Sequence, residues 1–173
     1  MQFLKDFKIY IVIIIIVLLF KQFVITPASV VGTSMDPTLK NNDVLLVDRI
    51  SYKFKNIERF DIIIINHSNP KHLIKRVVGL PGESVKYENG FLYVDGKKIE
   101  EPFLDGILTK DFNIEEIGYN TIPNDKYFVV GDNRNNSNDS REVEIGLIDK
   151  NSVLGKAFLR VWPLGKFQTI KHK

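Results

Sequence analysis

The pattern of apolar and polar residues divides the chain into two parts. Residues 9–20 are twelve uncharged apolar or aromatic residues, and the apolar segment extends over residues 7–25, with Lys8 and Lys21 near its ends. As a helix, these 19 residues would reach about 28 Å, close to the ~30 Å thickness of a bilayer's hydrocarbon core. Only a helix satisfies its own backbone in lipid. We therefore predict a membrane anchor over residues 1–25.

A cleaved secretion signal is the alternative for this segment, because the small residues "TPAS" at 26–29 resemble a cleavage site. The apolar stretch is longer than the ~7–15 residues usual in a signal, which favours the anchor. Lys5 and Lys8 precede the segment, Asp6 lies between them, and Lys21 follows. This slight basic excess predicts a single-pass protein with a cytoplasmic N-terminus and the rest of the chain on the extracytoplasmic face.

The remaining chain, residues 26–173, is expected to be one mainly β domain. Short apolar runs there alternate with turn residues, which is typical of strands. The candidate strands are residues 43–50, 61–66, 72–80, 127–132 and 153–162.

A small β-hairpin insertion is predicted over about residues 84–122. Asn89-Gly90 and Asp95-Gly96 are dipeptides that favour tight hairpin turns. Residues 101–123 are mixed in character and rich in turn residues, so we expect an exposed loop there.

Composition excludes several kinds of chemistry. Lys and Arg number 24 against 21 Asp and Glu, and this small net charge of +3 is dispersed, which argues against nucleic-acid binding. Without cysteine the chain has no disulfide, no thiolate metal site and no cysteine nucleophile. His67, His72 and His172 lack the spacing of a metal site. Any catalysis is therefore expected to use neither cysteine nor histidine.

Ser34 lies in the stretch "SMDPTL". Pro37 restricts Asp36 to extended geometry and begins a turn, which places Ser34 at a corner between strand and turn. A hydroxyl there can be exposed while its backbone is held. Taken alone, such a serine is more often part of a simple turn than a nucleophile.

Lys75 lies inside the apolar strand candidate 72–80. By alternation it shares a face with Leu73 and Val77, while Arg76 points the other way. Burial can lower the pKa of a lysine enough for it to act as a base, which arginine cannot do. The alternative is a solvent-exposed lysine on an edge strand.

The stretch "GDNRNNSNDSR" at residues 131–141 is a dense hydrogen-bonding loop after a strand. One interpretation is that Asp139 and Arg141 lock the loop through charged hydrogen bonds, so that Ser137 or Ser140 can orient a catalytic base. The alternative is a merely solvated or glycosylated loop, since Asn138-Asp139-Ser140 is an Asn-x-Ser sequon.

Four stretches together resemble one family. "SMDPTL", "DVLLVDR", "IKRVVGLPGE" and "GDNRNNSNDSR" follow in the order found in the bacterial type I signal peptidases of the short, single-anchor type. One such motif is weak, whereas four in order are specific, and the resemblance covers essentially the whole chain. It implies a mainly β, signal-peptidase-like fold behind an N-terminal transmembrane helix.

The resemblance also implies roles for individual residues. Ser34 matches the nucleophile and Lys75 the general base of a serine–lysine dyad. Ser137 matches the serine that hydrogen-bonds the lysine, and Asp139 and Arg141 match the acidic and basic positions that hold the site together.

Further positions follow from the same resemblance. Met35 is expected to pack beneath the substrate cleft, and Asp132 and Arg134 match structural positions of the last motif. Gly32 stands where many members carry a hydroxyl that helps to form the oxyanion hole. The Ser34 N–H is then the main oxyanion donor, and the second donor is not evident.

The implied activity is removal of signal peptides after small residues of the Ala-x-Ala type, through an acyl-enzyme and without cofactor or metal. The implied partners are secretory preproteins, the lipid bilayer and the export translocon, and no nucleic acid. Two other interpretations are weighed against it. Self-cleaving repressors share a serine–lysine dyad but carry a DNA-binding head, and a tethered paralogue would bind exported peptides without cutting them.

Overall fold

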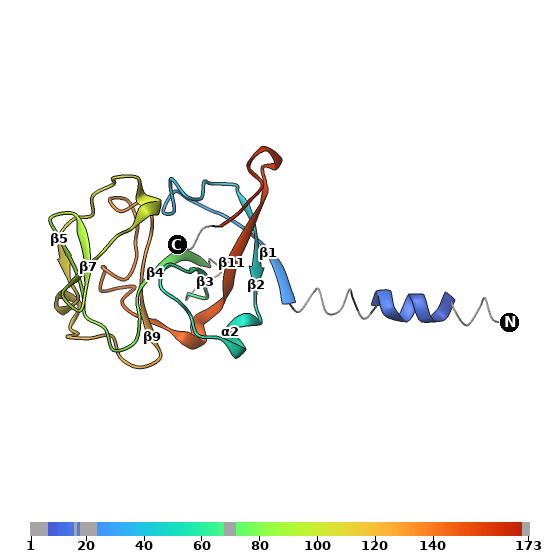
Figure 1. The fold of residues 1–173 in the computed structure, drawn as a ribbon, viewed down its shortest axis with the longest axis horizontal. Coiled ribbons are helices and arrows are strands. Elements are labelled where there is room, and N and C mark those ends of the chain that lie inside the picture. Colours follow the sequence, from blue (N-terminus) through green and yellow to red (C-terminus); the bar gives the residue numbers. More distant parts are fainter. Residues whose placement is uncertain (1–6, 16, 18–23, 68–71, 171–173) are drawn as a thin grey trace.

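The computed structural model describes residues 7–15, 17, 24–67 and 72–170. Residues 7–15 and 17 are helical and lie apart from the β domain (Figure 1). The predicted anchor, residues 1–25, therefore lies partly outside the described residues. In the described part of the chain, no helix has both the length and the apolar character needed to cross a membrane.

The prediction of a mainly β fold is confirmed. Eight strands of the described chain form one sheet, in which seven follow the order β1-β2-β11-β3-β4-β9-β10 and β12 pairs with β11. All of these pairs are antiparallel. Their bounds are β1 Ile25–Ser29, β2 Val44–Asp48, β3 Ile62–Ile65, β4 Leu73–Gly79, β9 Lys126–Val130, β10 Ile148–Asp149, β11 Val153–Trp162 and β12 Gln168–Thr169.

A second, smaller sheet lies at the end of the domain away from β1 (Figure 1). Its strands follow the order β7-β6-β5-β8. The Asn89-Gly90 turn joins β5 to β6, the Asp95-Gly96 turn joins β6 to β7, and all four turn residues have positive φ, as predicted for tight hairpins. The bounds are β5 Val85–Glu88, β6 Phe91–Val94, β7 Lys97–Ile99 and β8 Phe112–Asn113.

The prediction of an exposed loop over residues 101–123 is wrong. This segment contributes β8 to the small sheet and forms two short 3-10 helices, η1 Pro102–Leu104 and η2 Ile114–Ile117. Phe112, Ile114 and Ile122 are buried in the same apolar cluster as strands β5 and β6. Their burial outweighs the turn residues around them, because each large apolar side chain removed from water contributes about 1.5–3 kcal/mol.

Among the described residues, the core consists of three buried clusters. One joins the two sheets, since Val78 and Phe128 of the large sheet pack with Tyr87 and Leu92 of the small one. A second lies beneath the segment after β1, and the third lies around β3 and β9. The remaining short helices are α2 Ser51–Phe54, η3 Lys150–Ser152 and η4 Leu164–Lys166.

Two strand edges face a cleft rather than another strand. Among the described residues, β1 pairs only with β2. In β4, residues 73–75 pair only with β3, because β9 begins its pairing at Arg76. Backbone groups on these two edges are therefore free to pair with an extended chain.

Candidate active site

A cleft of about 750 Å³ runs between β1 and the start of β4. Ser34 and Lys75, which come from distant parts of the sequence, both line it. Most of the remaining lining is apolar and includes Val30, Ile74 and Leu154. The cleft therefore combines a hydroxyl and an amine with a surface suited to apolar side chains.

Ser34 is held in a turn that follows β1. The Asp36 N–H donates to the Thr33 carbonyl at 3.1 Å, which closes the turn around Ser34. The next side chain, Met35, is 1% exposed and packs in the core with Leu39. Met35 thus fixes the backbone beneath the cleft, and the half-buried Ser34 side chain is left at the cleft wall.

Lys75 is buried, so the alternative of a solvent-exposed lysine is wrong. The residue is only 3% exposed, and its side-chain Nζ donates to Ser137 Oγ at 3.1 Å. Burial lowers the pKa of Lys75 to about 8; nearby Asp139 opposes this shift and Arg141 adds to it. Desolvation disfavours the charged ammonium, so the neutral fraction near neutral pH is much larger than for an exposed lysine.

The loop 131–141 lies directly against the Ser34 turn. The Asn133 N–H donates to the Ser34 carbonyl at 3.0 Å, and the Asn133 side-chain amide donates to the Thr33 carbonyl at 3.1 Å. A Cβ on Gly131 would overlap both the Ser34 carbonyl oxygen and Ser137 Oγ. Gly131 and Asn133 therefore belong to the site, although sequence reasoning did not single them out.

Replacing Gly131 by alanine is expected to reduce cleavage about 100-fold, because displacing a reacting group by about 1 Å can cost that much. The added methyl group must push apart the Ser34 turn and Ser137. Gly165→Ala is the matched control, because a Cβ there meets no atom within 4 Å. Initial rates on one preprotein measure both variants. Equal rates for the two would show that the site tolerates the displacement.

Asp139 closes the loop from within. Its carboxylate accepts from Gly131 N–H at 3.0 Å and from two nitrogens of Arg141, Nε at 2.8 Å and an Nη at 2.9 Å. Burial acts to raise the pKa of Asp139, but the hydrogen bonds and charge of Arg141, with the Gly131 and Ser137 bonds, hold the pKa below its usual value. The carboxylate is therefore ionised, and its contacts hold the loop together.

Of the two serines considered for orienting a base, Ser137 contacts Lys75. Ser140 is fully buried and its Oγ accepts from the Val129 N–H at 3.0 Å, which joins the loop to β9.

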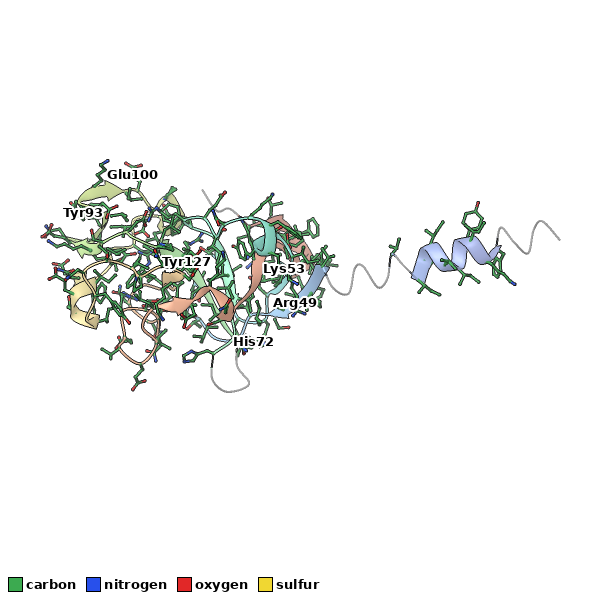
Figure 2. The ribbon with its side chains drawn as sticks, turned by 90° about the horizontal axis from the view of Figure 1, so that it is seen from below. Arg49, Lys53, His72, Tyr93, Glu100 and Tyr127 are labelled. Atoms are coloured by element: carbon green, nitrogen blue, oxygen red, sulfur yellow. The ribbon has the colours of Figure 1, made fainter. Side chains whose placement is uncertain are left out.

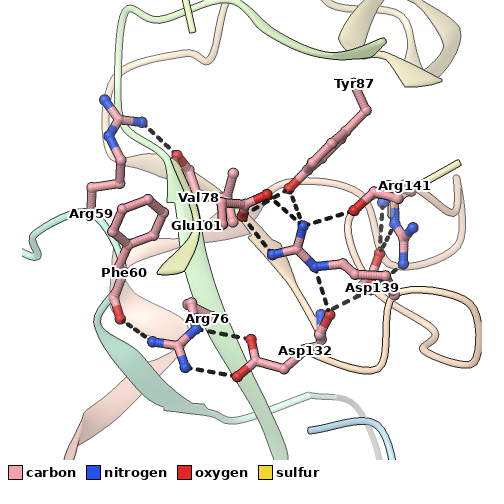
Figure 3. A network of polar contacts seen from close by, with 12 residues as sticks. Arg59, Phe60, Arg76, Val78, Tyr87, Glu101, Asp132, Asp139 and Arg141 are labelled. Atoms are coloured by element: carbon pink, nitrogen blue, oxygen red, sulfur yellow. Dashed lines mark hydrogen bonds and ion pairs between the residues drawn. The ribbon is translucent and has the colours of Figure 1, made fainter. Parts of the chain in front are cut away.

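A buried ionic network lies behind the site (Figure 3). Arg76 Nε and an Nη donate to the two carboxylate oxygens of Asp132 at 2.8 and 2.7 Å, and both side chains are fully buried. Arg76 also donates to the Phe60 carbonyl at 3.0 Å. Sequence reasoning placed Arg76 on the other face from Lys75 but gave it no partner. Its position inside an apolar strand was the signal, because a buried guanidinium requires an anion.

Arg134 connects the loop to the small sheet. It donates to Glu101 at 2.8 Å, to the Tyr87 hydroxyl at 3.0 Å and to the Thr109 hydroxyl at 2.9 Å. Its Nε donates to the Gly131 carbonyl at 3.2 Å. The small sheet therefore supports the position of the loop that carries Ser137.

Gly32 supplies no evident oxyanion donor. It has no side chain, adopts φ +93°, and its N–H donates to Asn41 Oδ1 at 2.9 Å. None of the hydrogen bonds among the described residues uses the Ser34 N–H as donor. Within the same part of the chain, no three Asp, Glu or His side chains lie close enough together to hold a metal ion.

Comparisons with known proteins identify the family of the chain. The family model described as "Signal peptidase, peptidase S26" matches residues 3–162. A signal peptidase I of Bacillus caldolyticus is 41% identical over 165 residues, which covers 90% of each chain. A signal peptidase IB of Staphylococcus aureus strain Mu50 is 36% identical over 167 residues, covering 89% of this chain and 86% of the relative.

A solved structure gives the same result for the fold. The crystal structure of a signal peptidase I from Enterococcus faecalis V583 matches with a TM-score of 0.54 and 36% identity, covering 59% of this chain and 97% of that one. The family match spans most of the chain and the relatives are aligned over nearly their whole length. The chain therefore belongs to the signal peptidase family, peptidase S26, and within it to the bacterial type I signal peptidases, which are hydrolases of the serine peptidase class.

Proposed function

We propose that this chain is a membrane-bound serine endopeptidase that removes N-terminal signal peptides from exported preproteins after small-x-small sequences of the Ala-x-Ala type. One observation carries the proposal. Ser34 and Lys75 line the same cleft, and Lys75 is a buried amine whose pKa is lowered to about 8. A hydroxyl and a partly neutral amine in one cleft are the pair that a serine–lysine peptidase requires.

The proposed chemistry is acyl transfer. Neutral Lys75 Nζ, held by Ser137, takes the proton from Ser34 Oγ, and the alkoxide attacks the carbonyl carbon of the scissile bond. The Ser34 N–H stabilises the oxyanion of the tetrahedral intermediate. Lys75 then protonates the departing amine, which becomes the N-terminus of the mature protein. The signal peptide remains as an ester on Ser34 until water, deprotonated by Lys75, hydrolyses it.

The cleft supports binding of an extended chain. The free edge of β1 and residues 73–75 of β4 offer backbone groups on its two sides. A bound strand presents alternate side chains to the same wall, which explains selection at two positions separated by one residue. Val30 and Ile74 line the cleft with Ser34 and Lys75, so apolar side chains are favoured there.

The proposal extends to location. Residues 1–25 act as a single membrane anchor with a cytoplasmic N-terminus, and residues 26–173 form the extracytoplasmic catalytic domain. Support comes from β1, which begins at Ile25, the last residue of the apolar segment, and borders the cleft. The cleft then lies where signal peptides leave the bilayer, and the export translocon that delivers them is a further partner.

Cleavage of a preprotein by the detergent-solubilised full chain, beside its Ser34→Ala variant, tests the proposal. We expect a cut after the small-x-small sequence, located by mass spectrometry, that the variant does not make. If both proteins fold and neither cuts, a tethered module that binds exported peptides without cutting them becomes the better account. A cut that persists in Ser34→Ala would assign the nucleophile to another residue.

The rate of cleavage is expected to rise with pH. Only neutral Lys75 accepts a proton, and its pKa is lowered to about 8 by burial. Below that pKa, kcat/KM should rise about tenfold per pH unit, and above it the rate should level off. Initial rates on a preprotein without titrating groups near the bond measure this. A flat profile through the Lys75 pKa would contradict its role as the base.

A further inference from the structure

Two basic side chains lie at the end of the cleft away from Ser34. Arg49 follows β2 directly and is exposed. Its backbone N–H donates to the Val24 carbonyl at 3.0 Å, which places Arg49 beside the start of β1. His72 precedes β4 directly and lies three residues before Lys75. Both line the cleft, and Figure 2 shows them at the same end of the domain.

The charges that line the cleft have one sign. Among the described residues its lining contains Lys75, Arg49 and His72 but no Asp or Glu. The adjacent carboxylate, Asp48, accepts from the Ser51 hydroxyl at 2.5 Å and from the Ser51 and Ile50 N–H groups at 2.9 Å. Arg49 takes part in none of the ion pairs of the described chain. Its charge is therefore available to a ligand at this end of the cleft.

The length of the strand shows which part of a preprotein reaches these residues. The cleaved bond lies opposite Lys75. Three residues of β4 span about 10 Å, so His72 lies opposite the third or fourth substrate residue counted from that bond. Arg49 lies beyond, at the start of β1. The apolar lining between Lys75 and this end takes the small residues that precede the bond. The two basic residues therefore face the signal-peptide side, His72 about three or four residues before the bond and Arg49 about four to six.

We propose that Arg49, assisted by His72, forms a charge-selective subsite that favours an acidic side chain, and disfavours a basic one, four to six residues before the cleaved bond. This inference rests on the proposed function. A guanidinium keeps its charge and offers two parallel N–H groups to a carboxylate. A neutral histidine also keeps one N–H donor. A lysine on the substrate would instead meet a like charge with no carboxylate in the lining to offset it.

Sets of three preproteins test the subsite. The members of a set differ only in carrying Glu, Gln or Lys at one position, and the sets place that position four, five or six residues before the bond. With the full chain in detergent, kcat/KM is expected to fall from Glu to Gln to Lys at one of these positions, by about threefold to fivefold per step, the size of a solvent-accessible ion pair. In Arg49→Glu the order should reverse. Lys53→Glu is the matched control, because Lys53 is an exposed cation on α2 that does not line the cleft.

Equal kcat/KM for the three preproteins at every position would overturn the subsite while leaving the peptidase assignment intact. The same reversal in Lys53→Glu would also overturn it, because attraction by the general surface charge would then explain the preference. Failure of the proposed function looks different: the Gln preprotein would not be cut at all, or would be cut equally by Ser34→Ala.

Discussion

Lys75→Met is expected to lower kcat/KM by about 10²–10⁴-fold, the contribution of a positioned general base. Methionine matches the length of the lysine side chain but cannot accept a proton. The loss should not come from unfolding, because the residue is 3% exposed and methionine is better suited to that environment than an amine. Initial cleavage rates and thermal unfolding, measured together, separate the two effects.

Two further variants define the reason for this loss. Lys75→Arg keeps the positive charge but cannot deprotonate, so it should be as inactive as Lys75→Met. Lys126→Met is the matched control: Lys126 lies on β9, its side chain is 30% exposed, and it pairs with Asp149 away from the cleft. It should keep full activity. Cleavage by Lys75→Arg at the rate of the unchanged protein would remove proton transfer by Lys75 from the mechanism.

Arg76→Met is expected to cost about 3–5 kcal/mol in the free energy of unfolding, because it leaves a buried carboxylate without its partner. Arg76 and Asp132 are both fully buried and are joined by two hydrogen bonds of 2.8 and 2.7 Å. Asp132 belongs to the loop that carries Ser137, so cleavage should fall as well. Denaturant unfolding followed by circular dichroism measures the change.

A second substitution tests whether the stranded charge causes this loss. In Arg76→Met/Asp132→Leu the buried carboxylate is gone, so the double variant should be more stable than Arg76→Met alone. Lys86→Met is the comparison for an exposed ion pair, since Lys86 and Glu88 are nearly half exposed, and it should unfold as the unchanged protein does. If Arg76→Met unfolded like Lys86→Met, the buried pair would contribute nothing to stability.

The strands were predictable because local pattern determines them. Apolar runs bounded by turn residues indicated β2, β3, β4 and β9, and the predicted strand over residues 153–162 has the bounds of β11. The Asn-Gly and Asp-Gly turns were predictable for the same reason, since their positive φ angles are a property of those residues.

What sequence could not show are contacts between segments far apart in the chain. Residues 101–123 read as a loop because their turn residues are local, while the surface that buries Phe112 belongs to other strands. Alternation placed Arg76 opposite Lys75, yet its partner lies 56 residues further along. Gly131 showed no signal either, because the need for a residue without Cβ arises only where Ser34 and Ser137 meet.

The support of Ser34 and Lys75 by a single loop has a consequence for substrate range. Asn133 holds the Ser34 backbone and Ser137 holds the Lys75 amine, so loop 131–141 fixes both reacting groups to one frame. The walls of the cleft, β1 and the start of β4, are strands of the large sheet that do not pair with each other. Side chains that line these walls, such as Val30 and Ile74, can differ in size while the loop holds the nucleophile and base at one spacing. The residues that determine substrate range and the residues that hold the reacting groups therefore lie in different parts of the molecule.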